Sequence, residues 1–246
     1  MLRVCIVVDV ENFLSLKQGN PRWNSWERFR GKINNLIKNL RYDKKGFDKI
    51  YNLIKKEKFP ISFMLVGSLF KPREKLEFID YGYHTLNHFP LTLIDDKKVE
   101  RETKNIYSSV SFSPPLWMIE DIKNPERIFR VLKKQKYKII VYRGTDDGLK
   151  YNHYDTIKKP EKRQGILCVH KSNDFTGKTS KRKIISIINE VKKNSKKDAV
   201  YCITTHDFVH KNLYNFKWLI KSLKRMENQK LIKIINLAQV IKSQNI

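Results

Sequence analysis

The sequence predicts an α/β protein in which helices cover a parallel sheet, organised as one domain over residues 1–246. Short apolar runs alternate with longer amphipathic, Lys-rich stretches through the whole chain, which is typical of repeated strand–helix units. The first run, RVCIVVDV at 3–10, is rich in β-branched residues, as expected for a strand buried on both faces. No shift in composition marks a domain boundary.

The other elements follow the first strand in a regular order. The stretch 47–57 places Ile50, Leu53 and Ile54 on one helical face, and FPISFMLVGS at 59–68 reads as the next strand, ending at Gly67. Two prolines break the strand end and turn at 111–117. The remaining helices are expected at 31–40, 97–110, 126–136, 181–194 and 216–226, and the remaining strands at 137–144, 165–173, 199–207 and 230–237.

Polar residues gather where the expected strands end. In a parallel barrel the carboxyl ends of the strands converge on one face, where active sites are built. The residues at these ends are Asp9, Glu11, Gly67, Ser68, His84, His88, Ser113, Trp117, Arg143, Asp146, Asp147, His170, Thr204 and His206.

The stretch YGYHTLNHFPLT at 81–92 holds His84 and His88, four residues apart. On a helical turn this spacing puts both side chains on one face, close enough to chelate one divalent cation. The acids Asp9 and Glu11 in DVEN can supply a third ligand, and two histidines with one carboxylate suit zinc or a similar cation. The alternatives are two ordinary histidines and an Asp9 that caps the following segment.

His206, at the end of the expected strand 199–207, is the candidate general acid for a leaving group. The alternative is a hydrogen-bonded core histidine. Asp207 either orients His206 or starts a turn.

The chain is strongly basic, with 51 Lys and Arg against 25 Asp and Glu and a formal net charge of +26. Such a field favours polyanionic partners. The basic residues are spread along helical stretches without a nucleic-acid recognition motif, so we expect a solvated basic surface and no specific nucleic-acid site.

Cys5, Cys168 and Cys202 each lie in an apolar run without CxxC spacing, so we expect buried free thiols and a reducing compartment. The opening segment has a brief apolar run that ends in acids, which indicates a strand rather than a signal sequence. No run reaches the roughly 20 apolar residues of a membrane-spanning helix. We expect a cytoplasmic protein, with work at a membrane surface as one option.

Taken in order, these motifs resemble those of the polysaccharide deacetylases, also called NodB-homology or carbohydrate esterase family 4 proteins. VVDVEN resembles the family's first motif, and FPISFMLVGS its second strand. HTLNH fits the histidine motif His-(Ser/Thr)-x-x-His, and ITTH matches the late histidine motif. FSPPLW falls where the family has Arg-x-Pro-x-(Tyr/Trp), and the tail from Trp218 resembles the closing helix, strand and helix.

The resemblance implies a distorted barrel of about seven parallel strands that holds one divalent metal ion. Zinc is expected first, with cobalt, nickel, manganese and iron as alternatives. His84, His88 and Glu11 would be the metal ligands, Asp9 the base and His206 the general acid. The opposite assignment of Asp9 and Glu11 remains open.

The resemblance also implies that Pro115 and Trp117 line the substrate groove. Ser113 stands where the family has an arginine that tunes the catalytic aspartate, so Asp9 lacks a neighbour that would favour its charged form. Arg143, at the end of another strand, is the hypothesised replacement and is assigned to the substrate-binding side of the site.

These residues predict metal-dependent removal of an N-acetyl or O-acetyl group from a sugar or polysaccharide intermediate, with a lipid-linked or nucleotide-linked sugar as an option. The basic surface would then help the protein to contact anionic membranes. One alternative is an amidohydrolase of the same fold that acts on a small non-sugar amide. The other is a catalytically degenerate carbohydrate-binding barrel, against which the retained Asp9 and His206 argue.

Overall fold

Seven parallel strands close into a barrel in the computed structural model, which describes residues 1–11, 45–117, 119, 124–142, 157–174, 180–207 and 213–243. The strand β1 (Leu2–Val10) closes it by pairing with both β2 (Ile61–Leu65) and β8 (Val200–His206). Between them follow β3 (Ile79–Tyr83), β4 (Ser111–Phe112), β5 (Ile139–Tyr142) and β7 (Ile166–Asp174). The predicted barrel of about seven parallel strands is confirmed.

The barrel is distorted where β1 meets its neighbours. The first residues of β1, Leu2 to Val4, pair with β9 (Ile232–Ile234), whereas Val7 to Val10 pair with β2. The strand β1 therefore changes partner half-way along one edge. A short strand that the sequence pattern did not indicate, β6 (Glu161–Arg163), runs antiparallel to β7 on the outside of the barrel.

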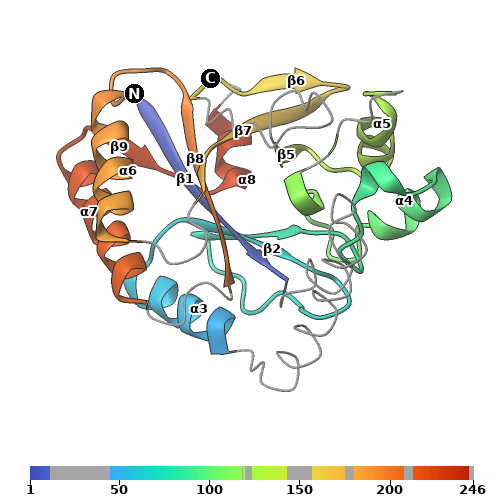
Figure 1. Ribbon diagram of the computed structural model, residues 1–246, viewed down its shortest axis with the longest axis horizontal. Helices are drawn as coiled ribbons and strands as arrows, with labels where there is room; N and C mark the ends of the chain where they lie inside the picture. The colour runs from blue at the N-terminus through green and yellow to red at the C-terminus, as the bar shows by residue number, and fades with distance from the viewer. Residues whose placement is uncertain are drawn as a thin grey trace, which may run out of the picture.

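The helices cover the barrel on opposite flanks (Figure 1). On one flank lie α3 (Lys45–Glu57), α6 (Lys181–Lys193) and α7 (Tyr214–Asn228); on the other lie α4 (Asp96–Glu102) and α5 (Arg127–Lys134). Two 3-10 turns cover Leu91–Leu93 and Pro115–Trp117, and α8 (Leu237–Ser243) ends the described chain. Within the described ranges, no helix has the length and apolar character needed to cross a membrane.

Side chains of the barrel strands alternate between two environments. In β1, Val4, Ile6 and Val8 pack outward in a cluster that includes residues of α3, α6 and α7, whereas Cys5 and Val7 point inward into a second cluster. This is the two-residue period of a strand buried on both faces. The three cysteines are buried and free, as predicted.

The helix expected at 97–110 is shorter than predicted. It begins after Asp95, whose side chain accepts a hydrogen bond from the backbone N–H of Lys98, and it ends at Glu102. The Thr103 hydroxyl donates to the carbonyl of Val99, and the Asn105 side chain bonds both the N–H and the carbonyl of Ser109. These polar side chains compete for the backbone groups that a longer helix would use. The helix expected at 31–40 lies outside the described residues.

The amino-terminal end of the barrel is closed by α8, and Asp80 of β3 holds it there. The Asp80 carboxylate accepts hydrogen bonds from the hydroxyls of Ser62 (2.9 Å) and Ser111 (2.7 Å) and from the backbone of Ala238 at the start of α8. The Ser62 hydroxyl also accepts from the N–H of Leu237. An acid at this position satisfies amides that α8 leaves unpaired at its first turn.

Replacement of Asp80 by alanine is expected to destabilise the protein by about 3 kcal/mol, because it leaves buried hydroxyl and amide donors without an acceptor. Asp80→Asn keeps an oxygen for the two serines and should cost less than half as much. Urea unfolding of both variants measures the difference. Equal loss in the two variants would contradict this role for the carboxyl oxygens.

Candidate metal centre

The candidate site is built by inward-facing residues at the carboxyl ends of the strands. Asp9 continues the inner row of Cys5 and Val7 in β1. His206 continues the inner row of Cys202 in β8, and it lies in register with Asp9 on the neighbouring strand. The alternation that fills the barrel with hydrocarbon lower down therefore brings an acid and a histidine together at this end.

Glu11 lies between the two predicted histidine ligands. Its Oε2 atom is 2.6 Å from His88 Nε2 and 3.2 Å from His84 Nε2. All three side chains are at least 98% buried, and their ligand atoms lie within 4.8 Å of one another. The structure thus brings together the three residues predicted to bind metal.

Ser113 fixes the orientation of His84. The backbone carbonyl of Ser113 lies 2.7 Å from His84 Nδ1. A carbonyl only accepts, so Nδ1 carries a proton and Nε2 is the ring nitrogen that faces Glu11. Metal-binding histidines are held by the same kind of contact on their second nitrogen.

His88 comes from a loop and not from a helical turn. Thr85 and His88 have positive φ angles of 62° and 63°, and the His88 N–H donates to the Thr85 hydroxyl. The Glu102 carboxylate anchors the loop by accepting from the backbone N–H and the side-chain amide of Asn87. The four-residue spacing still places the two histidine rings 4.8 Å apart, but strained loop backbone does this, as is common at functional sites.

The donor set fits a divalent metal ion. Zinc takes histidine nitrogen and carboxylate oxygen at about 2.0–2.2 Å, so ligand atoms around it lie about 3.4 Å apart, similar to the separations here. The Nδ1 atom of His88 is buried and has no hydrogen-bond partner in the described part of the chain, while its Nε2 atom faces Glu11 Oε2. A buried histidine in this state fits a metal ligand better than a structural residue.

Asp9 sits in an environment that favours its protonated form. Burial raises the pKa of Asp9 to about 7; the charge of His84 opposes this rise, Glu11 and Asp174 add to it, and a hydrogen bond from Ser113 opposes it. The Ser113 hydroxyl donates to Asp9 Oδ1 at 3.2 Å. Ser113, at the position of the missing arginine, thus still supports Asp9, with a neutral donor in place of a cation.

The pKa of Glu11 is shifted in the opposite direction to that of Asp9. Burial acts to raise the pKa of Glu11, but the charges of His88 and His206 and the hydrogen bonds from His84 and His88 outweigh it and hold this pKa well below the usual range. Two carboxyl groups two residues apart therefore differ in their protonation. Such a divergence separates a charged ligand from a group that can exchange a proton.

His206 lies at the rim of the same cluster. Its Nε2 atom is 3.7 Å from Glu11 Oε1 and 3.9 Å from Asp9 Oδ2, and its side chain is 17% exposed. Asp207 is fully buried and accepts a hydrogen bond from the backbone N–H of Glu11. Asp207 thus fixes the backbone that carries Glu11, a role that sequence reasoning did not assign.

The other predicted site residues have separate outcomes. Pro115 is buried, and Trp117, which is 7% exposed and has a φ of 57°, packs in the inner cluster of the barrel. Arg143 lies outside the described residues, as do Asp146 and Asp147. His170 is buried near Tyr142, with ring centroids 5.2 Å apart, on the outer side of β7.

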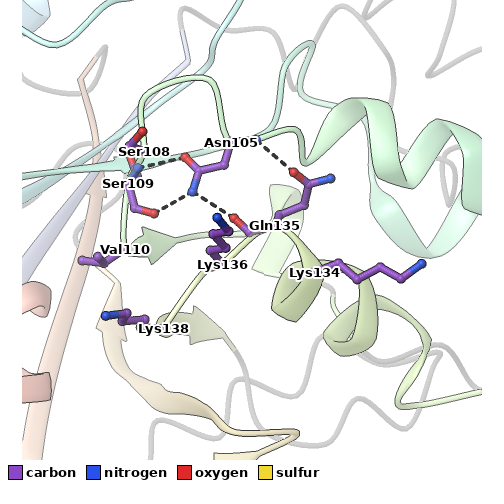
Figure 2. A pocket seen from close by; sticks show the side chains of 8 residues that line it. All are labelled: Asn105, Ser108, Ser109, Val110, Lys134, Gln135, Lys136 and Lys138. Carbon is purple, nitrogen blue, oxygen red and sulfur yellow. Dashed lines mark hydrogen bonds between the residues drawn. The ribbon is translucent and has the colours of Figure 1, made fainter.

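A hollow of about 440 Å³ lies at the opposite end of the barrel, where β4 and β5 begin (Figure 2). Its Asn105 side chain is already bonded to Ser109 and Gln135. None of the predicted site residues lines it. The lining residues are Asn105, Ser108, Ser109, Val110, Lys134, Gln135, Lys136 and Lys138.

No protein-family model and no curated protein sequence matches the chain. Among solved structures, a polysaccharide deacetylase from Mycobacterium smegmatis superposes with a TM-score of 0.64 at 11% identity, over 100% of this chain and 91% of that one. This chain has the polysaccharide deacetylase fold. The Puue allantoinase shares that fold: it superposes with a TM-score of 0.64 at 8% identity, over 98% of this chain and 89% of its own.

Metal analysis tests the centre directly. We expect His84→Ala and Glu11→Ala to lose most bound zinc or cobalt, because each removes one of three ligands. His170→Gln is the matched control, since it replaces a buried histidine on the outer side of the barrel. Full metal occupancy in both ligand variants would contradict the site.

The metal-free protein should become less stable as pH rises. Its folded state keeps a proton on Asp9 up to about pH 7, whereas the unfolded chain loses it near pH 4. The stabilisation is complete below pH 4 and is lost as pH rises to 7. In excess chelator, the unfolding free energy of Asp9→Asn relative to that of wild type should rise by about 2 kcal/mol between pH 5 and pH 8. Urea unfolding at both pH values measures this difference, and a difference that does not change with pH would count against the raised pKa.

Proposed function

We propose that this protein is a metal-dependent hydrolase that removes an N-acetyl or O-acetyl group from a sugar or polysaccharide intermediate. The observation that carries the proposal is the cluster of Glu11, His84 and His88 beside a second carboxyl group, Asp9, whose pKa is shifted the other way. A three-ligand site next to a separate base suits hydrolysis of an acyl bond. The fold shared with a polysaccharide deacetylase supports the choice of an acetylated sugar.

Glu11, His84 and His88 would hold the metal ion, which when bound polarises a carbonyl and lowers the pKa of water. Asp9 is the base that takes the proton from the attacking water. The positive charge of a bound ion would lower the pKa of Asp9 from its metal-free value, so that the carboxylate is ionised at neutral pH. The Ser113 hydroxyl holds Asp9 Oδ1 and leaves Oδ2, which faces His206, for proton transfer.

His206 is the acid that donates a proton to the leaving nitrogen or oxygen. It is the more exposed member of the cluster, so a leaving group can reach it, and it faces the carboxyl group of Asp9. A base and an acid within about 4 Å of each other fit a reaction in which one proton is taken and another delivered.

A second candidate is hydrolysis of a small non-sugar amide. The Puue allantoinase matches the chain with the same TM-score as the deacetylase, so the fold does not separate the two. Trp117 is buried in the barrel interior. Its ring is therefore not an open wall of a sugar-binding groove, which favours a smaller substrate.

The basic charge of the chain favours a substrate carrier that bears phosphate. A lipid-linked or nucleotide-linked sugar would suit a chain with a formal net charge of +26, because both carriers bear phosphate. The same charge would favour peripheral contact with an anionic membrane from the cytoplasmic side.

Acetate release from N-acetylated and O-acetylated sugar oligomers measures the proposed activity. We expect Asp9→Asn and His206→Ala to lower kcat by about 10²–10⁴-fold while metal content stays near that of wild type. Asp198→Asn, an exposed acid at the other end of β8, is the control. Hydrolysis of allantoin without acetate release would favour the second candidate, and inactivity of the metal-loaded protein on both classes would favour a binding protein.

A further inference from the structure

A lysine is buried inside the barrel just below the candidate centre. Lys171 continues the inner row of Leu167 and Val169 in β7, and its side chain is 2% exposed. It lies in register with Cys202, two strands from Asp9. Arg3 is the other buried cation of the described chain, and it sits at the opposite end of β1.

Asp174 is the partner of this lysine. Lys171 Nζ lies 2.5 Å from Asp174 Oδ2, although residues three apart on a strand normally face opposite sides. An irregularity in the pairing of β7 after Lys171 turns the Asp174 side chain inward as well. At this irregularity the Ser172 hydroxyl accepts a hydrogen bond from the backbone N–H of Cys202, which in a regular ladder would bond to a backbone carbonyl of β7. The strand is therefore built so that both charged groups enter the barrel.

The pair is incompletely satisfied by the described residues. An ammonium has three donors, and Asp174 is its one described hydrogen-bond partner, while Trp117 contributes a ring whose centroid is 5.5 Å from Nζ. Asp174 Oδ1 is buried and has no hydrogen-bond partner in the described ranges. Buried ion pairs rarely add stability, which points to a role other than holding the fold.

The charges of this pair reach the centre. The negative charge of Asp174 adds to the rise in the pKa of Asp9. Burial raises the pKa of the Cys202 thiol, and the charge of Lys171 opposes this rise while that of Asp9 adds to it, so Lys171 and Asp9 both lie within electrostatic range of one buried atom. Among the described residues, four carboxyl groups meet at this end of the barrel, those of Asp9, Glu11, Asp174 and Asp207.

We propose that the Lys171–Asp174 pair sets the net charge of the barrel interior beneath the carboxylate–histidine cluster and so tunes its affinity for a divalent cation. The inference rests on the proposed metal site. Lys171 is a positioning residue in this scheme: it contacts neither metal nor substrate, and it offsets the excess of carboxylates. Without it, the cluster would hold a cation too tightly and Asp174 would remain as an unpaired charge.

The test is the sign of two changes in zinc affinity, measured by competition with a chelating dye. Lys171→Met removes a positive charge and should tighten zinc binding by about tenfold, whereas Asp174→Asn removes a negative charge and should weaken it by about tenfold. The double variant and Lys171→Arg should bind within about threefold of wild type. A packing role would weaken binding in both single variants, because loosened walls spread the ligands.

The matched control is Lys181→Met, which removes an exposed lysine over the ring of Trp218 (5.8 Å to the centroid) and should leave zinc affinity unchanged. If circular dichroism shows that Lys171→Met is unfolded, the other two variants still test the inference. It then requires weaker zinc binding in Asp174→Asn and zinc affinity near that of wild type in Lys171→Arg. A wild-type protein that binds no zinc overturns the metal site and this inference together. Zinc binding in the wild type, with equal or no change in the single variants, overturns this inference alone.

Discussion

Alternate side chains of every barrel strand point into one enclosed interior, and at the carboxyl end those positions carry charge instead of hydrocarbon. An isolated buried charge is far too costly to keep, so each must be paired with another group from the same few positions. Glu11 is paired with His84 and His88, whereas Asp9, whose neutral form is favoured by burial, accepts a hydrogen bond from Ser113. Because the partners come from different strands, the polar cluster depends on closure of the barrel as much as on any one residue.

Ser113 illustrates this dependence. Its carbonyl accepts a hydrogen bond from His84 Nδ1, and its hydroxyl donates to Asp9. One residue directly after β4 therefore orients a candidate ligand and a candidate base at the same time. A guanidinium at this position would stabilise ionised Asp9 more strongly, whereas the hydroxyl leaves that carboxyl group with its raised pKa. The positive charge that an arginine would supply must then come from elsewhere in the barrel interior. Lys171 is the nearest buried cation of the described chain.

Much of this arrangement could be predicted from residue patterns. The long apolar runs of β1 and β8 and the amphipathic α6 and α7 follow from period and composition, and their inward rows end at Asp9 and His206. The short strand β3 is harder to predict, because Asp80 and Gly82 interrupt its apolar pattern. Helix α4 stops early because of side-chain hydrogen bonds, and the His84–His88 loop depends on Glu102 from another segment. Contacts between distant residues decide these features, and periodicity does not report them.

The spacing of the two acids on β1 has a physical reason. Successive residues of a strand face opposite sides, so adjacent acids in a regular strand would send one carboxyl group inward and the other toward the helices. Val10 stands between Asp9 and Glu11 and packs in the outer cluster without exposed surface. The intervening valine thus keeps the outer face apolar while both acids reach the interior. An acid–valine–acid order at the end of β1 can therefore supply both a ligand and a base.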